Sequence, residues 1–282
     1  MGWMATPVRG VLGDRIVTAM SAALPVPDAP VVSVAGAIAR MEAIAAALPA
    51  ADGLACFNRM YLDVTQQVNS RLGQGFFADP VFMTQLDVAF ANLYFAAAGT
   101  AGDPAAVPRA WRPLAARRAV AGIEPVQFAL AGMNAHINHD LPLAVVSTCT
   151  ALGTAPDAGP HFADYQKVDQ VLDAAEQSIR QSFESAAELA ADRHLAAVAS
   201  LIATWTINSA RDLAWNNCLL LWAVRDNPLA RGLFLGTLAT STALASQMLL
   251  VAVWDVYQYA SASRTLPRTM TSLYSRRPLL PK

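Results

Sequence analysis

The chain has 282 residues, of which 55% are hydrophobic and only 15% are charged, and its formal net charge is -1. This composition excludes a disordered chain, which needs low hydrophobicity or a large net charge, and an electrostatic nucleic-acid binder, which needs a basic excess. Soluble domains usually carry about 25% charged residues, so this chain must hide an unusually large share of its surface from water. One large core, a subunit interface or a membrane span would each account for that.

The first half of the chain shows helical patterns separated by proline and glycine. Apolar residues recur there at three- and four-residue spacing, which predicts helices. Asp79 and Pro80 supply an N-cap and a first-turn proline, and Gly73 and Gly75 end the preceding pattern. The helices predicted for this half cover residues 11–23, 30–48, 53–72 and 80–98, with a short one near Trp111.

The second half continues the helical pattern. Glu124 and Pro125 open a helix that runs to Asp140, and Pro142 then bends or restarts it. Further helices are predicted over about 161–190, over 192–225 as one or two elements, and from Pro228 to about Tyr257. No alternating period-two run bounded by turns is present in the sequence, so no sheet is expected. The predicted fold is all-α: a single compact multi-helix bundle with a long, buried, apolar C-terminal helix.

An uncharged segment from Gly232 to Trp254 is long enough to cross a bilayer. It contains hydroxyl and amide side chains suited to contacts between helices, and the sequence has no second comparable span. We therefore expect the buried helix of a soluble bundle and no membrane span.

We divide the chain into an N-terminal extension (1–28), one all-helical domain (29–258) and a basic C-terminal tail (259–282). The tail carries five basic residues and no acid. It either folds across an acidic face of its own or a neighbouring subunit, which would permit a homo-oligomer, or stays disordered.

The cysteines and the N-terminus bear on location. Cys56, Cys149 and Cys218 lie in apolar helical patterns, which indicates buried reduced thiols rather than a disulfide framework. The first ten residues lack the pattern of a secretory signal. We therefore expect a cytoplasmic location.

Two of the four histidines fall in one heptapeptide, residues 134–140, of a chain that is poor in polar residues. On a helix, His136, His139 and Asp140 share one face because positions three and four apart are neighbours. Asp140 at this spacing fixes the tautomer of His136 and raises its basicity, or both side chains bind one metal ion. Either interpretation makes His136 the most reactive group, with Asn134 on another face as a candidate for binding substrate.

A second polar helix face begins near His161 and carries Asp164 and Tyr165 one turn further on. Packed against His136, this face would add Asp164 and Tyr165 to a catalytic set with His136 and Asp140. The favoured interpretation is a metal-free acid/base pair, so no cofactor is predicted. In the alternative, His136, Asp140, His161 and Asp164 ligate a divalent metal such as zinc. A purely structural hydrogen-bonded network is the third interpretation.

Three other residues are candidates for substrate binding. Arg211 and Trp215 are four residues apart, so a guanidinium and an indole would face the same direction and hold a carboxylate and a flat apolar group. The competing interpretation is an ion pair between Arg211 and an acid that joins two helices, with Asp140 or Asp63 as the acid. Tyr61 belongs to a weaker polar patch on the helix predicted over 53–72.

Four stretches of the chain carry a family resemblance: 57–61 (Phe-Asn-Arg-Met-Tyr) with Val64-Thr65, 132–142 (Gly-Met-Asn-Ala-His-Ile-Asn-His-Asp-Leu-Pro), 161–168 and 211–215. They resemble the domain-of-unknown-function 5995 family, which is largely actinobacterial, over about residues 36–255. In that family the position of His139 varies and is often aromatic, which favours His136 and Asp140 as the working pair. The resemblance implies no activity, and the N-terminal extension and the tail lie outside it.

We predict an enzyme of small-molecule metabolism in which His136, oriented by Asp140, acts as general acid or base beside an apolar pocket. The expected reaction is a non-redox cyclisation, isomerisation or elimination, the last being lyase chemistry, on a small hydrophobic substrate with a polyketide- or terpenoid-like skeleton. The sequence contains no nucleotide-binding, phosphate-loop or serine-hydrolase motif. The alternatives are a metal-dependent hydrolase and a non-catalytic binding or scaffold protein.

Overall fold

The structure is a computed structural model that describes residues 29–103, 105–173 and 207–251. Within these residues every regular element is a helix, so the all-α prediction is confirmed. The helix predicted over 11–23, the N-terminal extension and the basic tail lie outside the described residues. All of residues 174–206 also lie outside them, and with them parts of the helices predicted over 161–190 and 192–225.

The first three helices each begin after a side chain that accepts a hydrogen bond from a backbone N–H of the first turn. These are Ser33 before α2 (Val34–Ala47), Asp52 before α3 (Gly53–Leu72) and Asp79 before α4 (Pro80–Gly99). The connection after α4 contains a short 3-10 turn, η2 (Arg109–Trp111), followed by α5 (Arg112–Arg117). α3 and α4 therefore begin where the sequence predicts them, whereas α2 begins at Val34, four residues later than predicted.

The next helical run is continuous but has a wider turn in its middle. It consists of α6 (Pro125–Ala135), η3 (His136–Asp140) and α7 (Leu141–Leu152). η3 is a π-helical turn, in which the N–H of Leu141 donates to the carbonyl of His136, five residues back. Pro142 has no N–H and its ring crowds the carbonyl one turn earlier, which explains the break in the α-helical pattern. The predicted restart at Pro142 is thus a wide turn that carries the histidine segment.

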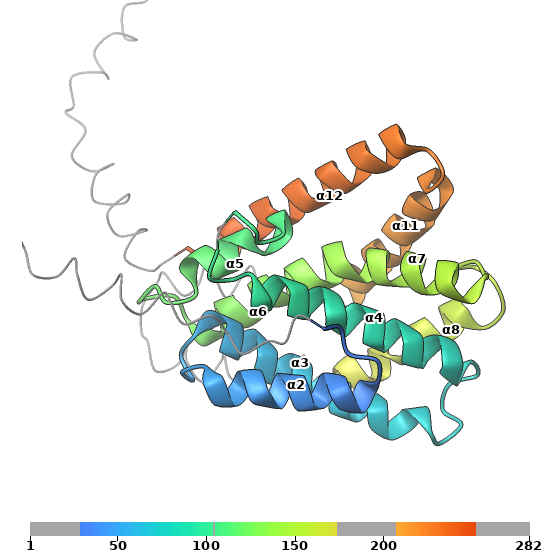
Figure 1. Cartoon of the computed structure of the whole chain (residues 1–282), viewed down its shortest axis with the longest axis horizontal. Helices are drawn as coiled ribbons and strands as arrows, with labels where there is room; N and C mark the ends of the chain where they lie inside the picture. The colour runs from blue at the N-terminus through green and yellow to red at the C-terminus, as the bar shows by residue number, and fades with distance from the viewer. Residues whose placement is uncertain (1–28, 104, 174–206, 252–282) are drawn as a thin grey trace, which may run out of the picture.

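The remaining helices are α8 (His161–Lys167), α11 (Ile207–Val224) and α12 (Pro228–Leu249). Figure 1 shows that the helices are arranged in three layers. α2 and α3 lie on one side, α4 and the α6–η3–α7 run lie in the middle, and α12 lies on the other side with α11. α3 packs against α6, α4 against α7, and α12 against α6. η3 therefore lies in the middle layer, with helices on both of its faces.

A close approach between α3 and α6 occurs at Gly132. A Cβ at this position would lie 2.5 Å from the Cγ atom of Phe57, nearer than real Cβ contacts ever come. The Phe57 ring is edge-on to the rings of Trp111 and His136, with centroids 5.3 Å and 5.6 Å away. Gly132, one turn before His136, therefore allows the ring packing that surrounds this histidine.

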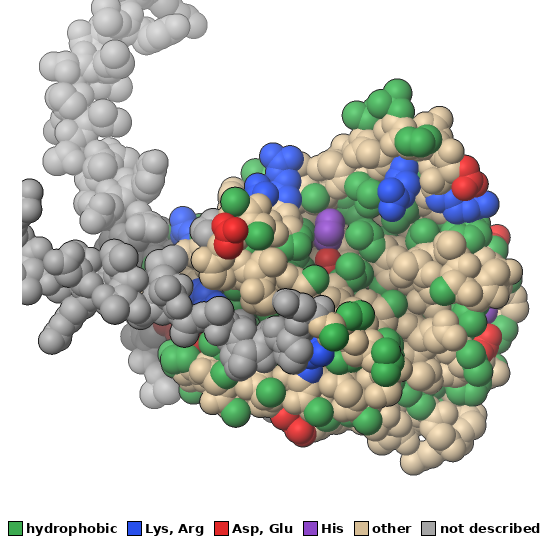
Figure 2. All heavy atoms as spheres, in the orientation of Figure 1, with side chains coloured by type: hydrophobic (Ala, Val, Ile, Leu, Met, Phe, Trp, Pro, Cys, Tyr) green, Lys and Arg blue, Asp and Glu red, His purple; other side chains and the backbone are tan. Residues whose placement is uncertain are grey.

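The C-terminal apolar helix differs from the prediction in its burial. α12 buries one face, which includes Leu238, Thr242 and Ser246, whereas Leu229 and Leu233 are 74% and 66% exposed. Figure 2 shows hydrophobic side chains on the surface at this edge of the molecule. A helix that is apolar on all sides gives no sequence signal for the face that packs, and for that reason the prediction of a fully buried helix was too strong.

Two other features of the core bear on the predictions. Cys56, Cys149 and Cys218 are buried free thiols, as expected. Among the described residues, the helix that could cross a membrane by length and composition is α4, not the segment from Gly232. α4 lies in the middle layer of the bundle, and the core helix of a soluble protein passes the same test, which fits the expectation of no membrane span.

Candidate active site

His136 lies in the core, on η3, with 2% of its surface exposed. Its ring stacks on Phe90 of α4, with centroids 3.5 Å apart, and meets the edge of Tyr61 of α3 at 4.5 Å. Its Nδ1 atom lies 3.0 Å from Oδ2 of Asp140. Packing on two sides and a hydrogen bond on a third therefore hold the imidazole in one orientation.

Asp140 is held by three hydrogen-bond donors. Oδ2 accepts from Nε1 of Trp111 at 2.9 Å as well as from His136, and Oδ1 lies 2.7 Å from Nδ1 of His139. Burial acts to raise the pKa of Asp140, but the hydrogen bonds from the two histidines outweigh it and hold the pKa below its usual range. Asp140 is therefore an ionised carboxylate, and its side-chain oxygens only accept hydrogen bonds.

The state of Asp140 fixes the tautomer of His136. Burial lowers the pKa of His136 despite the opposing effect of Asp140, so the ring is neutral. Because the carboxylate has no proton to give, Nδ1 carries the hydrogen of the 3.0 Å contact and Nε2 keeps a lone pair. The predicted pairing of His136 and Asp140 is thus present as a hydrogen bond, across the π-helical turn.

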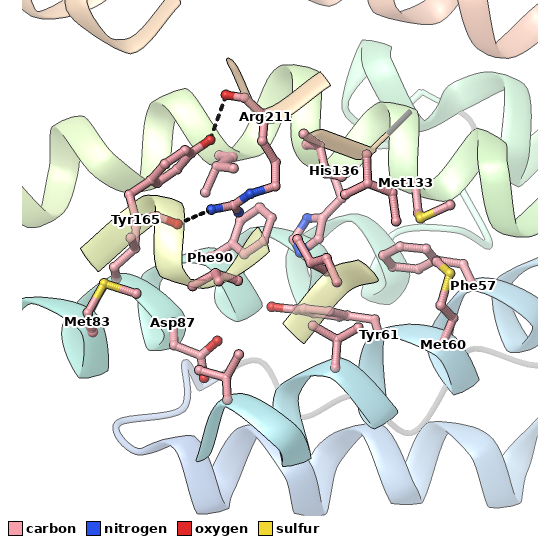
Figure 3. Close-up of a pocket in the computed structure, with 18 residues that line it drawn as sticks. Phe57, Met60, Tyr61, Met83, Asp87, Phe90, Met133, His136, Tyr165 and Arg211 are labelled. Carbon is pink, nitrogen blue, oxygen red and sulfur yellow. Dashed lines mark hydrogen bonds between the residues drawn. The ribbon is translucent and has the colours of Figure 1, made fainter. Parts of the chain in front are cut away.

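A cavity of about 90 Å³ lies beside the imidazole, between α3, α4, η3, α8 and α11. Figure 3 shows its lining, which is mostly apolar and includes three methionines. The polar residues in the lining are Tyr61, Asp87, His136, Tyr165 and Arg211. The apolar ones include Met60, Val64, Met83, Leu86, Phe90, Met133, Ile137, Leu141, Leu172 and Ile207.

Three buried polar atoms in this cavity lining have no hydrogen-bond partner in the described part of the chain. They are Nε2 of His136, the hydroxyl oxygen of Tyr61 and Oδ2 of Asp87. Leaving such atoms unpaired costs about 1–3 kcal/mol each, so native structures rarely keep them without a reason. Their presence around one cavity makes it the candidate functional site, where a ligand could supply the missing partners.

The sequence interpretation overlooked Asp87. It is the only charged residue within α4, and it shares a helix face with Met83, four residues before it, and Phe90, three residues after it. A lone carboxylate on the inner face of an apolar helix was the signal that could have identified it. Burial raises the pKa of Asp87 to about 7.

Arg211 lines the cavity, but its hydrogen bonds join α8 and α11. Its guanidinium donates to Asp169 and to the backbone carbonyl of Tyr165, and the Tyr165 hydroxyl donates to the carbonyl of Arg211 at 2.8 Å. The sequence analysis considered an ion pair between Arg211 and Asp140 or Asp63. The ion pair is present, but its acid is Asp169. Trp215 is not part of the cavity lining and packs against the ring of Tyr165.

Asp164 does not come near the His136 cavity. It accepts hydrogen bonds from the backbone N–H groups of Ala78 and Asp79, at 2.9 Å and 2.6 Å, and from Lys167 at 2.8 Å. These contacts tie α8 to the start of α4, so the structure gives Asp164 a structural environment. Asp164 is not part of the cavity lining, whereas the next residue, Tyr165, is.

The alternative metal set is not assembled. His161 stacks on Phe82 with centroids 4.0 Å apart, and its Nδ1 lies 3.0 Å from the carbonyl of Ala155. In the described ranges no group of three or more histidine, cysteine, aspartate or glutamate side chains could hold a metal ion. His136 and Asp140 therefore do not share a ligand shell with His161 and Asp164, because the two pairs lie in separate clusters.

Asn134 lies on the opposite face of the helical run from His136. Its amide donates to the carbonyl of Thr242 and to the hydroxyl of Ser246, both at 2.9 Å. It thereby joins α6 to α12 and lines a groove between η3, α11 and α12 that is separate from the His136 cavity. The prediction that Asn134 and His136 occupy different faces agrees with these contacts, and the structure does not bring Asn134 to the cavity.

An all-helical fold that encloses an aspartate-held imidazole beside an apolar cavity defines the class: a helical-bundle protein with a buried histidine–aspartate pair. The chain belongs to the family described as "Family of unknown function (DUF5995)", whose model matches residues 34–252. No curated protein and no solved structure matches the chain.

Proposed function

We propose that this protein is a small-molecule enzyme that transfers a proton to or from an uncharged, mostly apolar substrate, with His136 as the general acid or base. The observation that carries the proposal is the lone pair of Nε2, which is buried at the cavity without a partner while Asp140 holds Nδ1. A base oriented by a hydrogen-bonded carboxylate is a recurrent arrangement for proton transfer.

The site can stabilise the charge that this step creates. When Nε2 takes a proton, the ring becomes an imidazolium inside a core where charge is costly. Asp140 lies 3.0 Å from the same ring and is ionised, so it offsets that charge directly. Trp111 and His139 keep the carboxylate in place during the change.

The size and lining of the cavity limit the substrate. A cavity of about 150 Å³ can hold benzene, so the 90 Å³ here holds a molecule smaller than benzene unless the walls move. A polyketide- or terpenoid-like skeleton would require the walls to move. Met60, Met83 and Met133 supply unbranched, adaptable side chains for such a change. Isomerisation, cyclisation and elimination remain the reaction classes within this proposal, since each needs a positioned proton donor or acceptor.

The experiment follows solvent deuterium into unknown products. The purified full chain is incubated in D₂O with a non-polar metabolite extract of the cells it comes from, and mass spectrometry detects carbon-bound deuterium. We expect at least one compound to gain deuterium or change structure with the wild type, and His136→Gln to lower its rate by about 10²–10⁴-fold. His161→Gln is the matched control, because this second buried histidine lies outside the cavity.

Two results would count against the proposal. Equal labelling by the wild type and His136→Gln would remove the histidine from the chemistry. No protein-dependent labelling of any compound would favour a binding or scaffold protein in which the histidine segment is structural.

A further inference from the structure

Two unpartnered oxygens face the same cavity as the imidazole. Figure 3 shows Tyr61 and Asp87 below His136, on neighbouring helices α3 and α4. Neither the Tyr61 hydroxyl nor Oδ2 of Asp87 has a hydrogen-bond partner among the described residues. The two groups are close enough that the charge of Asp87 affects the ionisation of Tyr61.

Both oxygens belong to groups that can carry a proton at neutral pH. Burial, followed by the charge of Asp87, raises the pKa of Tyr61 well above its ordinary value, so Tyr61 stays a neutral phenol. The pKa of Asp87 is raised to about 7, and no cation forms an ion pair with it within the described ranges. The cavity therefore offers two O–H donors beside one nitrogen acceptor, and apolar surface elsewhere.

This combination has a defined chemical complement. Two convergent donors suit an oxygen that gains negative charge, and a nearby base suits a carbon that loses a proton. A carbonyl compound with a hydrogen on its α-carbon supplies both features and remains uncharged in the ground state. A carboxylate would meet an unfavourable site, because the only cationic side chain in the described cavity lining, the guanidinium of Arg211, is already paired with Asp169.

We propose that Tyr61 and Asp87 form a donor pair for a carbonyl oxygen, with Asp87 as the second proton-transfer residue, and that the substrate is a compact uncharged ketone or aldehyde. This inference rests on the proposed role of His136 and names the substrate class of the same site. It adds one catalytic residue and one substrate-binding interaction to that role.

The proton-transfer step balances without a co-reactant. Nε2 of His136 removes the α-proton, and the electron pair of the broken C–H bond forms a carbon–carbon double bond. The carbonyl π-electrons move to oxygen, which takes the proton of Asp87 and leaves an enol held by Tyr61. The imidazolium exchanges its proton with solvent and then returns a proton to the same carbon or to the far carbon of a conjugated system, while the enol proton returns to Asp87. The second route moves a double bond and is an isomerisation.

Charge is conserved inside the site during this step. His136 gains one positive charge as Asp87 gains one negative charge, so the net charge of His136, Asp87 and Asp140 together does not change. In a low-dielectric core, a step that conserves net charge avoids the large cost of an isolated buried ion. A histidine without a facing acid would lack this compensation.

The test uses acetone, which has only four heavy atoms, and cyclopentanone as probes with the full-length protein in D₂O. Proton NMR follows the loss of the α-proton signals, and ¹³C-methyl signals of methionine report binding, because three of the nine methionines line the cavity. We expect the wild type to accelerate exchange over buffer and His136→Gln to abolish that acceleration. Cyclopentane, which has no acceptor, should bind more weakly than cyclopentanone.

Variants of the two donors separate their roles. Asp87→Asn keeps a hydrogen-bond donor but has no acidic proton to transfer, so the exchange rate should fall by about 100-fold while the probe affinity changes little. Tyr61→Phe removes one donor and should lower the rate by about 10²–10³-fold. Asp226→Asn, at a side chain that is 84% exposed, is the matched control and should behave like the wild type.

The outcomes distinguish this inference from the proposed function. If the wild type exchanges the probe, His136→Gln does not, and Asp87→Asn matches the wild type, Asp87 has no proton-transfer role although the function of His136 stands. If no ketone shifts the cavity methionine signals, or a bound ketone is not exchanged, the carbonyl class is wrong. Deuterium labelling of another compound in the extract would then still support the proposed function. Asp87→Leu tests whether misfolding explains a loss of activity. This variant should keep the fold and bind cyclopentane better than the wild type does, but should no longer exchange the α-protons of the ketone.

Discussion

Asp140 and Asp164 are both buried aspartates, and each accepts three hydrogen bonds, but their surroundings differ. Asp164, with a side chain that is 0% exposed, receives two backbone N–H groups and the ammonium of Lys167. Asp140, at 3%, receives an indole and two imidazoles. One of those imidazoles, His136, has a second nitrogen at a cavity with no partner in the described residues.

The difference makes Asp140, and not Asp164, the candidate for a functional carboxylate. The three donors to Asp164 are two backbone N–H groups and the Lys167 ammonium, and none of them is a buried group without a partner among the described residues. This cluster therefore serves the packing between α4 and α8. The donors to Asp140 include His136, whose other ring nitrogen, Nε2, has no hydrogen-bond partner among the described residues. Burying such an atom without a partner costs the folded protein about 1–3 kcal/mol. The unpaired Nε2 atom of His136, and not the buried negative charge that both share, distinguishes the Asp140 cluster from the Asp164 cluster.

The largest expected effect is on activity, from Asp140→Asn. The amide would donate to Nδ1 of His136 instead of accepting from it, so the ring would turn to the other tautomer and Nε2 would lose its lone pair. We expect deuterium incorporation to fall by about 10³–10⁴-fold, as for a triad aspartate changed to asparagine. The rate per folded molecule is the measurement, with folding checked by circular dichroism. A fall of less than tenfold would make Asp140 a structural residue like Asp164.

A second effect concerns Asp87 and pH. The unfolded carboxyl loses its proton near pH 4, whereas the folded one keeps it until about pH 7. Rising pH therefore destabilises the folded state across this window, with the full penalty of up to about 4 kcal/mol above pH 7 and none below pH 4. Asp87→Asn removes this penalty, so its stability relative to the wild type should increase as the pH rises from 4 to 7.

Urea unfolding of both proteins at several pH values measures this difference, with Asp226→Asn as the control. His136 and Tyr61 face Asp87 and are present in both proteins, so their own titration largely cancels in the comparison. A difference that stays constant between pH 4 and 7 would mean that Asp87 ionises normally in the folded protein.

The third effect is on stability, from Asp164→Asn. The amide loses the ion pair with Lys167 and sets one N–H group against a backbone N–H of Ala78 or Asp79, so the unfolding free energy should fall by about 3 kcal/mol. Probe binding to the cavity methionines should not change. The comparison between Asp140 and Asp164 would fail if this variant lost activity while it kept its stability.

The smallest expected effect compares two glycines of apolar helices. Gly132→Ala places a methyl group against Phe57 and should cost about 2 kcal/mol through overpacking. Gly236→Ala, on α12, meets nothing within 4 Å and should stabilise the helix by up to about 1 kcal/mol. Thermal unfolding of the two variants provides the measurement, and equal effects would contradict the close approach of α3 and α6.

Local signals in the sequence predicted most helix boundaries. Asp52 and Asp79 are caps whose side chains bond backbone groups only a few residues away, so the residues themselves specify the helix starts. The pairing of His136 with Asp140 is also local, because both lie in one turn. These features need no information about distant parts of the chain.

Features that depend on tertiary packing could not be predicted in the same way. Nothing local in the sequence shows that Asp164 faces the start of α4. The buried face of α12 was hidden by its uniform apolar composition, and the Asp169 partner of Arg211 depends on how α8 meets α11. Asp87 is different: it was overlooked, although its position on the helix with Met83 and Phe90 was enough to identify it from the sequence.

The contact between Gly132 and Phe57 has a consequence for how this protein can change over evolution. The missing side chain at 132 sets the spacing of two helices whose other residues form the chamber around the imidazole. A larger residue there would push the phenyl ring toward Trp111 and His136, so the shape of the cavity would change without any substitution at His136, Tyr61 or Asp87. Descendants with a larger cavity should therefore differ first at the three methionines of the cavity lining, and should keep glycine at position 132.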